Sequence, residues 1–331
     1  MLPLSLDFTP YQNHGDGIFP AAHSQPFFWS DRALPVGTAT AGDNWRAIFW
    51  GVPFETIAPA EQAEVMNRVV GWLSDLGDSS FVVDQRVGLV GEPRTYTLTV
   101  QQMDNGLSNS VWLTNTLSPW LQIDLASITG DATYNAATRQ LTWSGTLPSG
   151  GQHLITYQAT PTGPLALGQI IENEVVLHDG RHDLTFTRRA TSWVNAPEIA
   201  TTITAVPNQP LVATVFTTTV DLQNLGLAAS GPISTVVSLP NSFYVVTDTL
   251  RSSAGSASVG DRRLYWEGLL DVGDVVTLTL VLTREVTAFP QRAAFTTLVD
   301  DGVTHPAFFA EWIDLPVYTS YLPVLRHESV P

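Results

Sequence analysis

Cysteine and lysine are both missing from this sequence of 331 residues. The absence of cysteine excludes disulfide staples, thiolate zinc sites, iron–sulfur clusters and cysteine nucleophiles. All 15 basic residues are therefore arginine, and against 31 acidic residues they leave a net charge of −16. A chain this acidic lacks the basic face that nucleic acid requires and is disfavoured at anionic membranes. We therefore expect no nucleic-acid partner.

Long apolar runs and catalytic signatures are also lacking. No stretch approaches the roughly 18 apolar residues of a membrane span, and the first residues lack the basic and apolar segments of a signal peptide. The nucleotide-binding, P-loop, serine-hydrolase and zinc-protease motifs do not occur. We therefore predict that the chain is not an enzyme. Apolar residues nevertheless make up 44% of the sequence, which is enough for more than one core.

The residue pattern divides the chain into four regions: a mixed segment at 1–80, two strand-like stretches at 81–196 and 197–316, and a tail at 317–331. In the mixed segment, the compact apolar run 45–52 predicts a buried strand. The run 60–73 predicts an amphipathic helix. Its apolar stripe is Ala63, Met66, Val69, Val70 and Leu73.

From residue 81 onward, polar and apolar residues alternate with the period of a half-buried strand, as at 95–100, 154–157 and 184–187. Turn-forming clusters separate these runs, among them 104–106, 148–151 and 179–180. No convincing helix interrupts them. This pattern is typical of an antiparallel β-sandwich.

The second strand-like stretch repeats the first. Four segments recur in the same order at offsets of 120 to 123, and they pair 96–100 with 216–220, 106–107 with 226–227, 141–145 with 264–268, and 179–180 with 301–302. A unit of about 120 residues is too long for a solenoid repeat but suits an immunoglobulin-like domain of about 100 residues. The sequence therefore predicts a mainly β protein with two tandem immunoglobulin-like sandwiches. The short join at 195–198 predicts limited swing between them.

The repeated segments resemble the conserved repeat domain family, which is number eleven among the families called domains of unknown function. Its pattern has an opening strand, an Asn-x-Gly turn and a late Leu-x-Trp-x-Gly segment. The late segment is Leu141, Trp143 and Gly145 in the first repeat, and it recurs at 264–268. The resemblance implies tandem modules on bacterial surface or secreted proteins.

The mixed segment resembles the closing strand and helix of a glutamine-amidotransferase-like, flavodoxin-like domain, in residues 47–55 and 70–73. That family's nucleophile and catalytic histidine are absent. The resemblance therefore implies a small α/β remnant without activity.

Two histidines and two aspartates gather at one turn: His178, Asp179, His182 and Asp183. Their nitrogen and oxygen atoms are suited to a divalent metal. The second repeat keeps the Asp-Gly turn but has no histidine there. We therefore favour a structural hairpin turn, and these four residues stay as candidate metal ligands.

Two further sets of polar residues occur near the N-terminus. Residues 13–17 could offer oxygens to calcium, but they lack the ligand count of an EF-hand, so a glycine-rich turn is favoured. His14, His23, Ser30 and Asp31 include the residue types of a hydrolase triad without its structural context. We expect no cofactor, with calcium as the alternative.

Exposed aromatic residues are the other candidate site. Trp112, Trp120 and Tyr134 are candidates for a sugar-stacking platform, although core or partly buried packing is the favoured interpretation of the set. Trp143 and Trp266 recur in both repeats, as core residues do. The arginine pairs at 188–189 and 262–263 are expected at solvated strand ends.

The expected function is that of a non-catalytic structural or adhesive module, extracellular or on the cell surface, from the C-terminal part of a larger secreted protein. Its expected partners are the other domains of that protein, or surface proteins and glycans. The alternative is a carbohydrate- or ligand-binding accessory module of a secreted hydrolase or peptidase.

Overall fold

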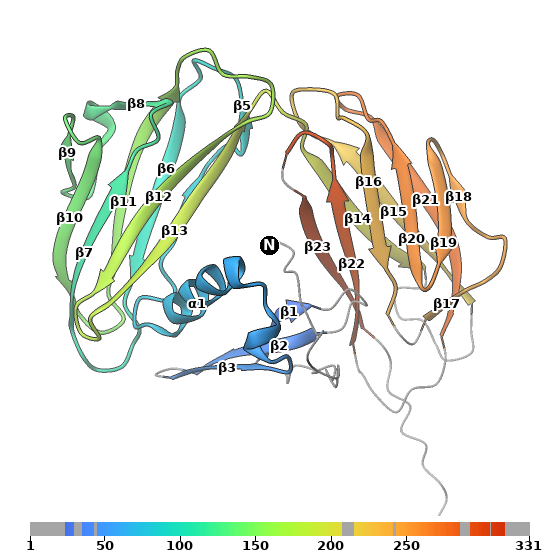
Figure 1. The fold of residues 1–331 in the computed structure, drawn as a ribbon, viewed down its shortest axis with the longest axis horizontal. Coiled ribbons are helices and arrows are strands. Elements are labelled where there is room, and N and C mark those ends of the chain that lie inside the picture. Colours follow the sequence, from blue (N-terminus) through green and yellow to red (C-terminus); the bar gives the residue numbers. More distant parts are fainter. Residues whose placement is uncertain are drawn as a thin grey trace, which may run out of the picture.

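The computed structural model describes residues 24–29, 35–42, 45–206, 215–240, 243–284, 292–304 and 306–314. Two β-sandwiches lie side by side, and a small unit of three strands and one helix lies below the first of them (Figure 1). The calcium candidate at 13–17, the triad candidates His14, His23, Ser30 and Asp31, and the tail at 317–331 lie outside the described residues. The expected mainly β fold is confirmed.

Sandwich one has a four-stranded and a six-stranded sheet. The first has the order β4-β6-β11-β8, with bounds Ser80–Val83, Arg94–Gln101, Gln152–Pro161 and Leu121–Asp124. The second has the order β5-β13-β12-β7-β10-β9, with bounds Val87–Gly88, Leu184–Val194, Gln169–Asp179, Asn109–Thr116, Gln140–Leu147 and Thr133–Asn135. A 3₁₀ turn, η2 (Leu125–Ser127), follows β8. The central pairings are those of an immunoglobulin-like sandwich.

Sandwich two has two five-stranded sheets. The first contains β14 (Ile199–Val206), β15 (Val215–Asn224), β21 (Val275–Arg284), β17 (Phe243–Val245) and β18 (Arg251–Ser252). The second has the order β19-β20-β16-β22-β23, with bounds Ser256–Gly260, Arg263–Gly268, Ile233–Ser238, Arg292–Asp300 and Ala307–Asp314.

The two sandwiches share one topology, which explains the sequence repeat. The order β4-β6-β11-β8 returns as β14-β15-β21-β17, and β13-β12-β7-β10-β9 returns as β23-β22-β16-β20-β19. The strand registers agree as well. Leu141 pairs with Asn115 as Leu264 pairs with Val237. The matches found in the sequence therefore join equivalent strands.

The Leu-x-Trp-x-Gly segment has the same packing role in both sandwiches. Leu141 and Leu264 are fully buried. The tryptophan ring lies over the glycine two residues later, so a Cβ on Gly145 would come within 2.6 Å of Trp143, and one on Gly268 within 2.5 Å of Trp266. The glycine is required because the indole occupies the space of its side chain. Trp266 is buried in its core, and Trp143 packs partly buried against the other.

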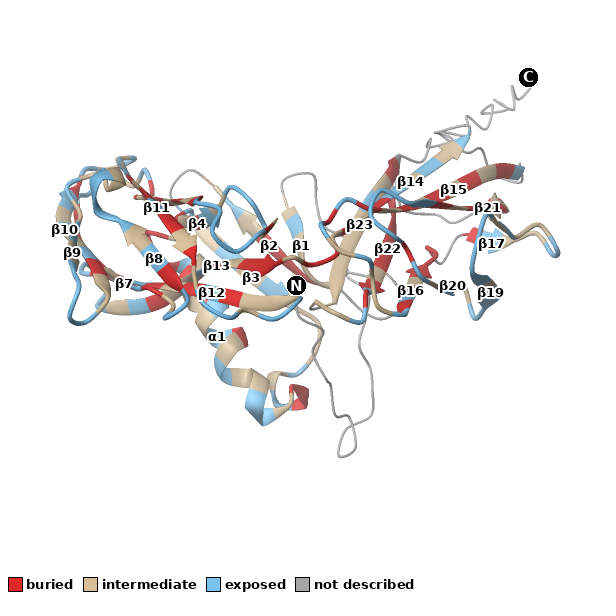
Figure 2. Cartoon of the chain, turned by 90° about the horizontal axis from the view of Figure 1, so that it is seen from above, coloured by how far each residue is buried: buried red, intermediate tan, exposed pale blue. Residues whose placement is uncertain are grey.

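The two cores differ in one polar cluster. In sandwich one, Tyr157 donates to Asn115 at 2.6 Å, Asn173 donates to Tyr157 at 2.6 Å, and Asn115 donates to Asn173 at 2.9 Å. The strand registers place Val237, Leu282 and Phe295 at the equivalent positions of sandwich two, all fully buried. Figure 2 shows buried residues along the strands of both sandwiches. The same three core positions are therefore joined by hydrogen bonds in sandwich one and occupied by apolar side chains in sandwich two.

The N-terminal unit is an antiparallel sheet of β1 (Ser24–Trp29), β2 (Pro35–Ala41) and β3 (Arg46–Trp50), followed by the 3₁₀ turn η1 (Phe54–Thr56) and the helix α1 (Pro59–Leu73). A flavodoxin-like sheet is built of parallel strands, whereas every pairing described here is antiparallel. The prediction of a buried strand at 45–52 is wrong for one face. Phe49 is 64% exposed and Trp45 is 52% exposed, while Ile48 and Trp50 pack toward the helix.

The helix predicted at 60–73 is confirmed, but its predicted apolar stripe is partly wrong. Val65 and Val69 face the sheet and are buried. Ala63, Met66 and Leu73 are exposed. The prediction failed because α1 has two neighbours, the sheet and β13, so its buried face is not one simple stripe.

Helix α1 lies along β13, the strand that borders β5 in sandwich one. Asn67 donates to Thr187 at 2.9 Å, and Gly71 lies against Phe186 and Arg188. The expectation that Arg188 is solvated is wrong, because its guanidinium is turned into this contact.

The join between the sandwiches is short and hydrogen-bonded. Leu225 donates its amide to the carbonyl of Glu198 at 2.8 Å, and Leu227 donates to that of Ala196 at 2.9 Å. Ala196 is fully buried, and a Cβ on Gly226 would come within 2.3 Å of the Glu198 amide nitrogen. The connecting segment is therefore packed into the loop that follows β15.

Candidate functional site

The histidine-rich turn predicted from the sequence forms a polar cluster around the buried carboxylate of Asp179, while His182 itself is exposed. Asp179 ends β12, and its Oδ1 accepts hydrogen bonds from the amides of Arg181 and His182 and from the side chain of Asn109. Its Oδ2 lies 3.1 Å from Nδ1 of His182. Asp75, which follows α1, forms a group of three with Asp179 and His182. The potential metal-ligating atoms of these three side chains lie within 4.8 Å of one another.

Hydrogen-bond donors already surround both carboxylates. Oδ2 of Asp75 accepts from Arg181 at 2.9 Å and from Asn105 at 3.0 Å. Burial opposes ionisation of Asp179, but hydrogen bonds from His182 and Asn109 outweigh it, so the pKa of Asp179 lies below its ordinary value. Arg181 supplies the positive charge that a metal ion would otherwise bring.

The second repeat shows what His182 does. Asp301 in sandwich two accepts from the amides of Val303 and Thr304, and Thr304 donates its hydroxyl to the same carboxylate at 2.6 Å. His182 stands where Thr304 stands, and either side chain closes the same turn. The geometry therefore favours the structural interpretation of this turn.

The other two candidate metal ligands lie apart from this group. His178 stacks on Trp112, with ring centroids 3.7 Å apart, and contacts Thr185 through Nδ1 at 2.9 Å. Asp183 lies 3.5 Å from the other nitrogen of His178, and its side chain is 96% exposed. The four predicted residues thus separate into two pairs, and Asp75, which was not among them, joins Asp179 and His182.

The candidate aromatic platform is also divided. Tyr134 pairs with Leu141, which pairs with Asn115. Trp112 precedes Asn115 by an odd number of residues, so it projects from the opposite face of the sheet. Trp112 and Trp120 are both partly exposed, and only Trp120 lies near Tyr134, since it follows Pro119 and packs over Gly163.

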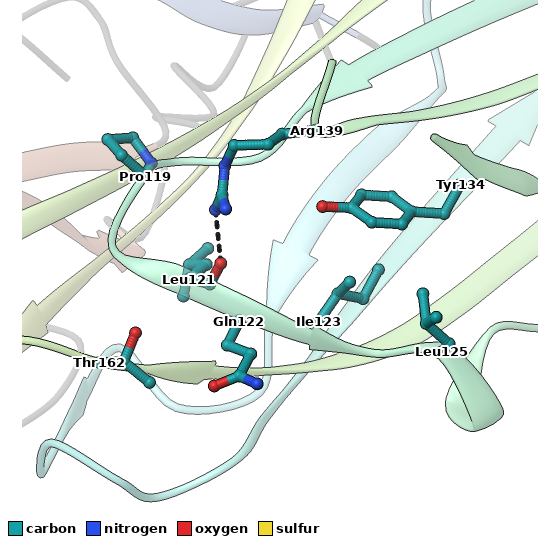
Figure 3. A pocket seen from close by; sticks show the side chains of 8 residues that line it. All are labelled: Pro119, Leu121, Gln122, Ile123, Leu125, Tyr134, Arg139 and Thr162. Atoms are coloured by element: carbon teal, nitrogen blue, oxygen red, sulfur yellow. Dashed lines mark hydrogen bonds between the residues drawn. The ribbon is translucent and has the colours of Figure 1, made fainter. Parts of the chain in front are cut away.

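A pocket of about 370 Å³ lies where Tyr134 meets the loop before β8 (Figure 3). Its lining comprises Pro119, Leu121, Gln122, Ile123, Leu125, Tyr134, Arg139 and Thr162. The hydroxyl of Tyr134 points toward the guanidinium of Arg139, which is itself directed at the carbonyl of Leu121 (Figure 3). The lining therefore combines aliphatic side chains with the hydroxyl of Tyr134, the guanidinium of Arg139 and other polar groups.

Arg139 is held in place by its backbone and by one of its nitrogens. Its φ of 56° lies in the left-handed region, which is uncommon for an arginine. Nη2 donates to the carbonyls of Ser118 and Leu121, both at 2.6 Å. Nε is buried and has no hydrogen-bond partner among the described residues. The side chain is thus fixed by two bonds, and part of its donor capacity is unused.

Sequence reasoning missed Asp75 and Arg139, the two charged residues that define these sites. Asp75 lies 104 residues from Asp179, so no local pattern joins them. Arg139 did leave a signal. The carbonyl of Arg139 accepts from Leu117 as that of Arg262 accepts from Leu239, and Arg262 also has a positive φ. An arginine recurring at an offset of 123 could have been added to the repeat.

No protein-family model and no curated protein sequence matches the chain. The resemblances to the conserved repeat domain family and to an amidotransferase-like domain are therefore not established as membership. Among the described residues, no helix is long and apolar enough to cross a membrane.

The solved structures to which the chain is similar include proteins of Streptococcus agalactiae. The C-terminal domain of its AgI/II polypeptide BspA is 8% identical, covers 72% of this chain and 99% of its own, and has a TM-score of 0.27. A fragment of its major pilin GBS80 is 11% identical, covers 70% and 90%, and has a TM-score of 0.28. Red sea bream transglutaminase is 13% identical and covers 86% of this chain but 38% of its own, with a TM-score of 0.26. At this level of similarity, function is argued from the chain's own residues.

Proposed function

We propose that the chain is a non-catalytic structural and adhesive module of an extracellular or cell-surface protein, in which two stiffly joined sandwiches act as a spacer. The observation that carries this proposal is the junction. The connecting segment is buried, and the loop after β15 donates two backbone hydrogen bonds to it. A spacer needs such a joint, because a flexible linker transmits neither position nor force.

The segment entering sandwich one is held in a similar way. The amide of Met103, in the loop after β6, donates to the carbonyl of Asp75 at 2.8 Å. Asp75 precedes β4 as Glu198 precedes β14. Both sandwiches thus receive the preceding part of the chain in the same loop, which supports one stiff rod from α1 to sandwich two.

The absence of cysteine makes this proposal simple to test with a pair of spin labels. Ser144→Cys and Ser258→Cys place labels on exposed strand positions of sandwich one and sandwich two. Pulsed electron paramagnetic resonance is expected to give one narrow distance distribution. Gly226→Ala should broaden it, because the new Cβ clashes with the Glu198 backbone. A broad distribution in the parent protein would overturn the spacer role.

A second candidate function is a carbohydrate- or ligand-binding accessory module. The pocket at Tyr134 and Arg139 is the observation that favours it. Trp112, in contrast, lies on the other face of the sheet and does not contribute to this site.

A further inference from the structure

We propose that the pocket around Arg139 binds a saccharide that carries a carboxylate. This inference deepens the second candidate function and rests on it, and it does not depend on the stiffness of the junction. Its first support is charge. Arg139 is the one ionised group lining the pocket, and no acidic side chain lies among the lining residues.

The guanidinium of Arg139 is ordered without being neutralised. Its two hydrogen bonds go to the backbone carbonyls of Ser118 and Leu121, which carry no formal charge. A carboxylate would add a charge-assisted bond to a guanidinium whose geometry is already set, so little conformational entropy would be lost on binding. This arrangement suits an anionic group better than a neutral one.

The second repeat supplies a comparison within the same molecule. Arg262 occupies the position of Arg139, and it donates to the hydroxyl of Tyr244 at 3.0 Å with its guanidinium 4.9 Å from the centre of that ring. The equivalent arginine in sandwich two is therefore covered by a tyrosine of its own domain. In sandwich one, the space beside Arg139 stays open as the pocket.

The remaining lining favours a hydroxylated ring over a simple acid. The lining also includes the hydroxyl groups of Tyr134 and Thr162, the amide of Gln122 and the aliphatic side chains of Leu121, Ile123 and Leu125. Sugars present hydroxyls at their edges and apolar C–H groups on their faces, which match such a mixture. Trp120 lies beside the pocket and offers a further aromatic surface and a fluorescent reporter.

The test compares three probes that separate ring from charge: D-glucuronate, D-glucose and acetate. Saturation-transfer NMR and tryptophan fluorescence measure binding to the full chain. D-glucuronate is expected to bind at least tenfold more tightly than either of the other two. Equal binding of D-glucose would show that the charge of Arg139 does not contribute to binding. Equal binding of acetate would show that the sugar ring does not contribute. Tighter binding of a tripeptide with a free C-terminal carboxylate would assign the pocket to a protein partner and overturn the proposal.

Gln122→Glu tests the same point without removing a structural contact. The substitution keeps the size of the side chain and adds a negative charge to the lining of the pocket that also contains Arg139, so D-glucuronate binding should fall at least tenfold. Arg139→Gln should do the same, although loss of its bonds to Ser118 and Leu121 could disturb the loop. Arg262→Gln in sandwich two is the matched control and should leave binding unchanged. Unchanged binding in Gln122→Glu, with the fold intact by circular dichroism, would refute the site.

Discussion

Nη2 of Arg188, on β13, donates to the backbone carbonyl oxygen of Gly71, in the last turn of α1, at 3.2 Å. The same guanidinium donates to the carbonyls of Gly77 at 3.0 Å and Ser79 at 2.8 Å. From the other side, Arg46 donates to the carbonyl of Trp72 at 2.6 Å. Two arginines thus satisfy the free carbonyls at the end of the helix, where positive charge is also favoured.

This contact predicts that Arg188→Met detaches α1 from sandwich one. Burial and the nearby charge of Arg46, partly opposed by Asp78, together lower the pKa of Arg188 to about 10, so the group stays charged at neutral pH. Its loss leaves several carbonyls without donors, at a cost on the order of 3 kcal/mol. Amide hydrogen exchange in the helix should accelerate. Arg189→Met removes exposed ion pairs with Glu174 and with Glu64 of α1, and it should cost less than about 1 kcal/mol. An equal loss in both variants would contradict the prediction.

The Asp179 turn should make stability depend on pH. Since the pKa of Asp179 is lowered in the folded state, its stabilisation is complete above its unfolded pKa of about 4 and is lost as pH falls through the folded value. Asp179→Asn should cost about 1–3 kcal/mol at pH 7, and it should flatten the decline in stability below about pH 4. Urea unfolding at several pH values measures both effects. Asp183→Asn, at an exposed neighbour, should retain the acid dependence.

Tyr157→Phe should destabilise sandwich one by about 1–3 kcal/mol, because Asn115 and Asn173 each lose a buried partner. Burial raises the pKa of Tyr157 well above its ordinary value, so its phenol should ionise only on unfolding. The triple change Asn115→Val, Tyr157→Leu and Asn173→Phe copies the apolar set of sandwich two. It should recover part of the loss, as measured by thermal unfolding. A triple variant less stable than the single one would show that the polar cluster is specific to its surroundings.

Gly268→Ala should cost more than Gly145→Ala, although each places a Cβ against a tryptophan ring. Trp266 is 1% exposed and cannot move aside, whereas Trp143 is only partly buried. Overpacking of this kind costs about 1–3 kcal/mol. Calorimetry and near-ultraviolet circular dichroism measure the two losses. Gly260→Ala, where no atom lies within 4 Å of the new Cβ, is the control and should be neutral.

The repeat and the strand pattern were readable from the sequence because strand alternation and turn residues are local signals. The offsets of 120 to 123 correctly joined β6 with β15 and β10 with β20. The burial of Arg188 was not readable. Its partners are carbonyls more than one hundred residues away, and a carbonyl is the same for every residue type.

The candidate sites were less predictable for the same reason. Asp179 and His182 are neighbours in the sequence and were found, whereas Asp75 reaches them only through the fold. Tyr134 was named for its aromatic ring, but the pocket depends on Arg139, which the hairpin between β9 and β10 turns back toward it.

The loop after β6 in sandwich one and the loop after β15 in sandwich two each bind the segment that precedes their sandwich. That segment follows a helix in the first case and another sandwich in the second. Gene duplication could therefore lengthen or shorten the protein by whole sandwiches. Each added sandwich would carry the loop whose backbone amides bind the segment before it.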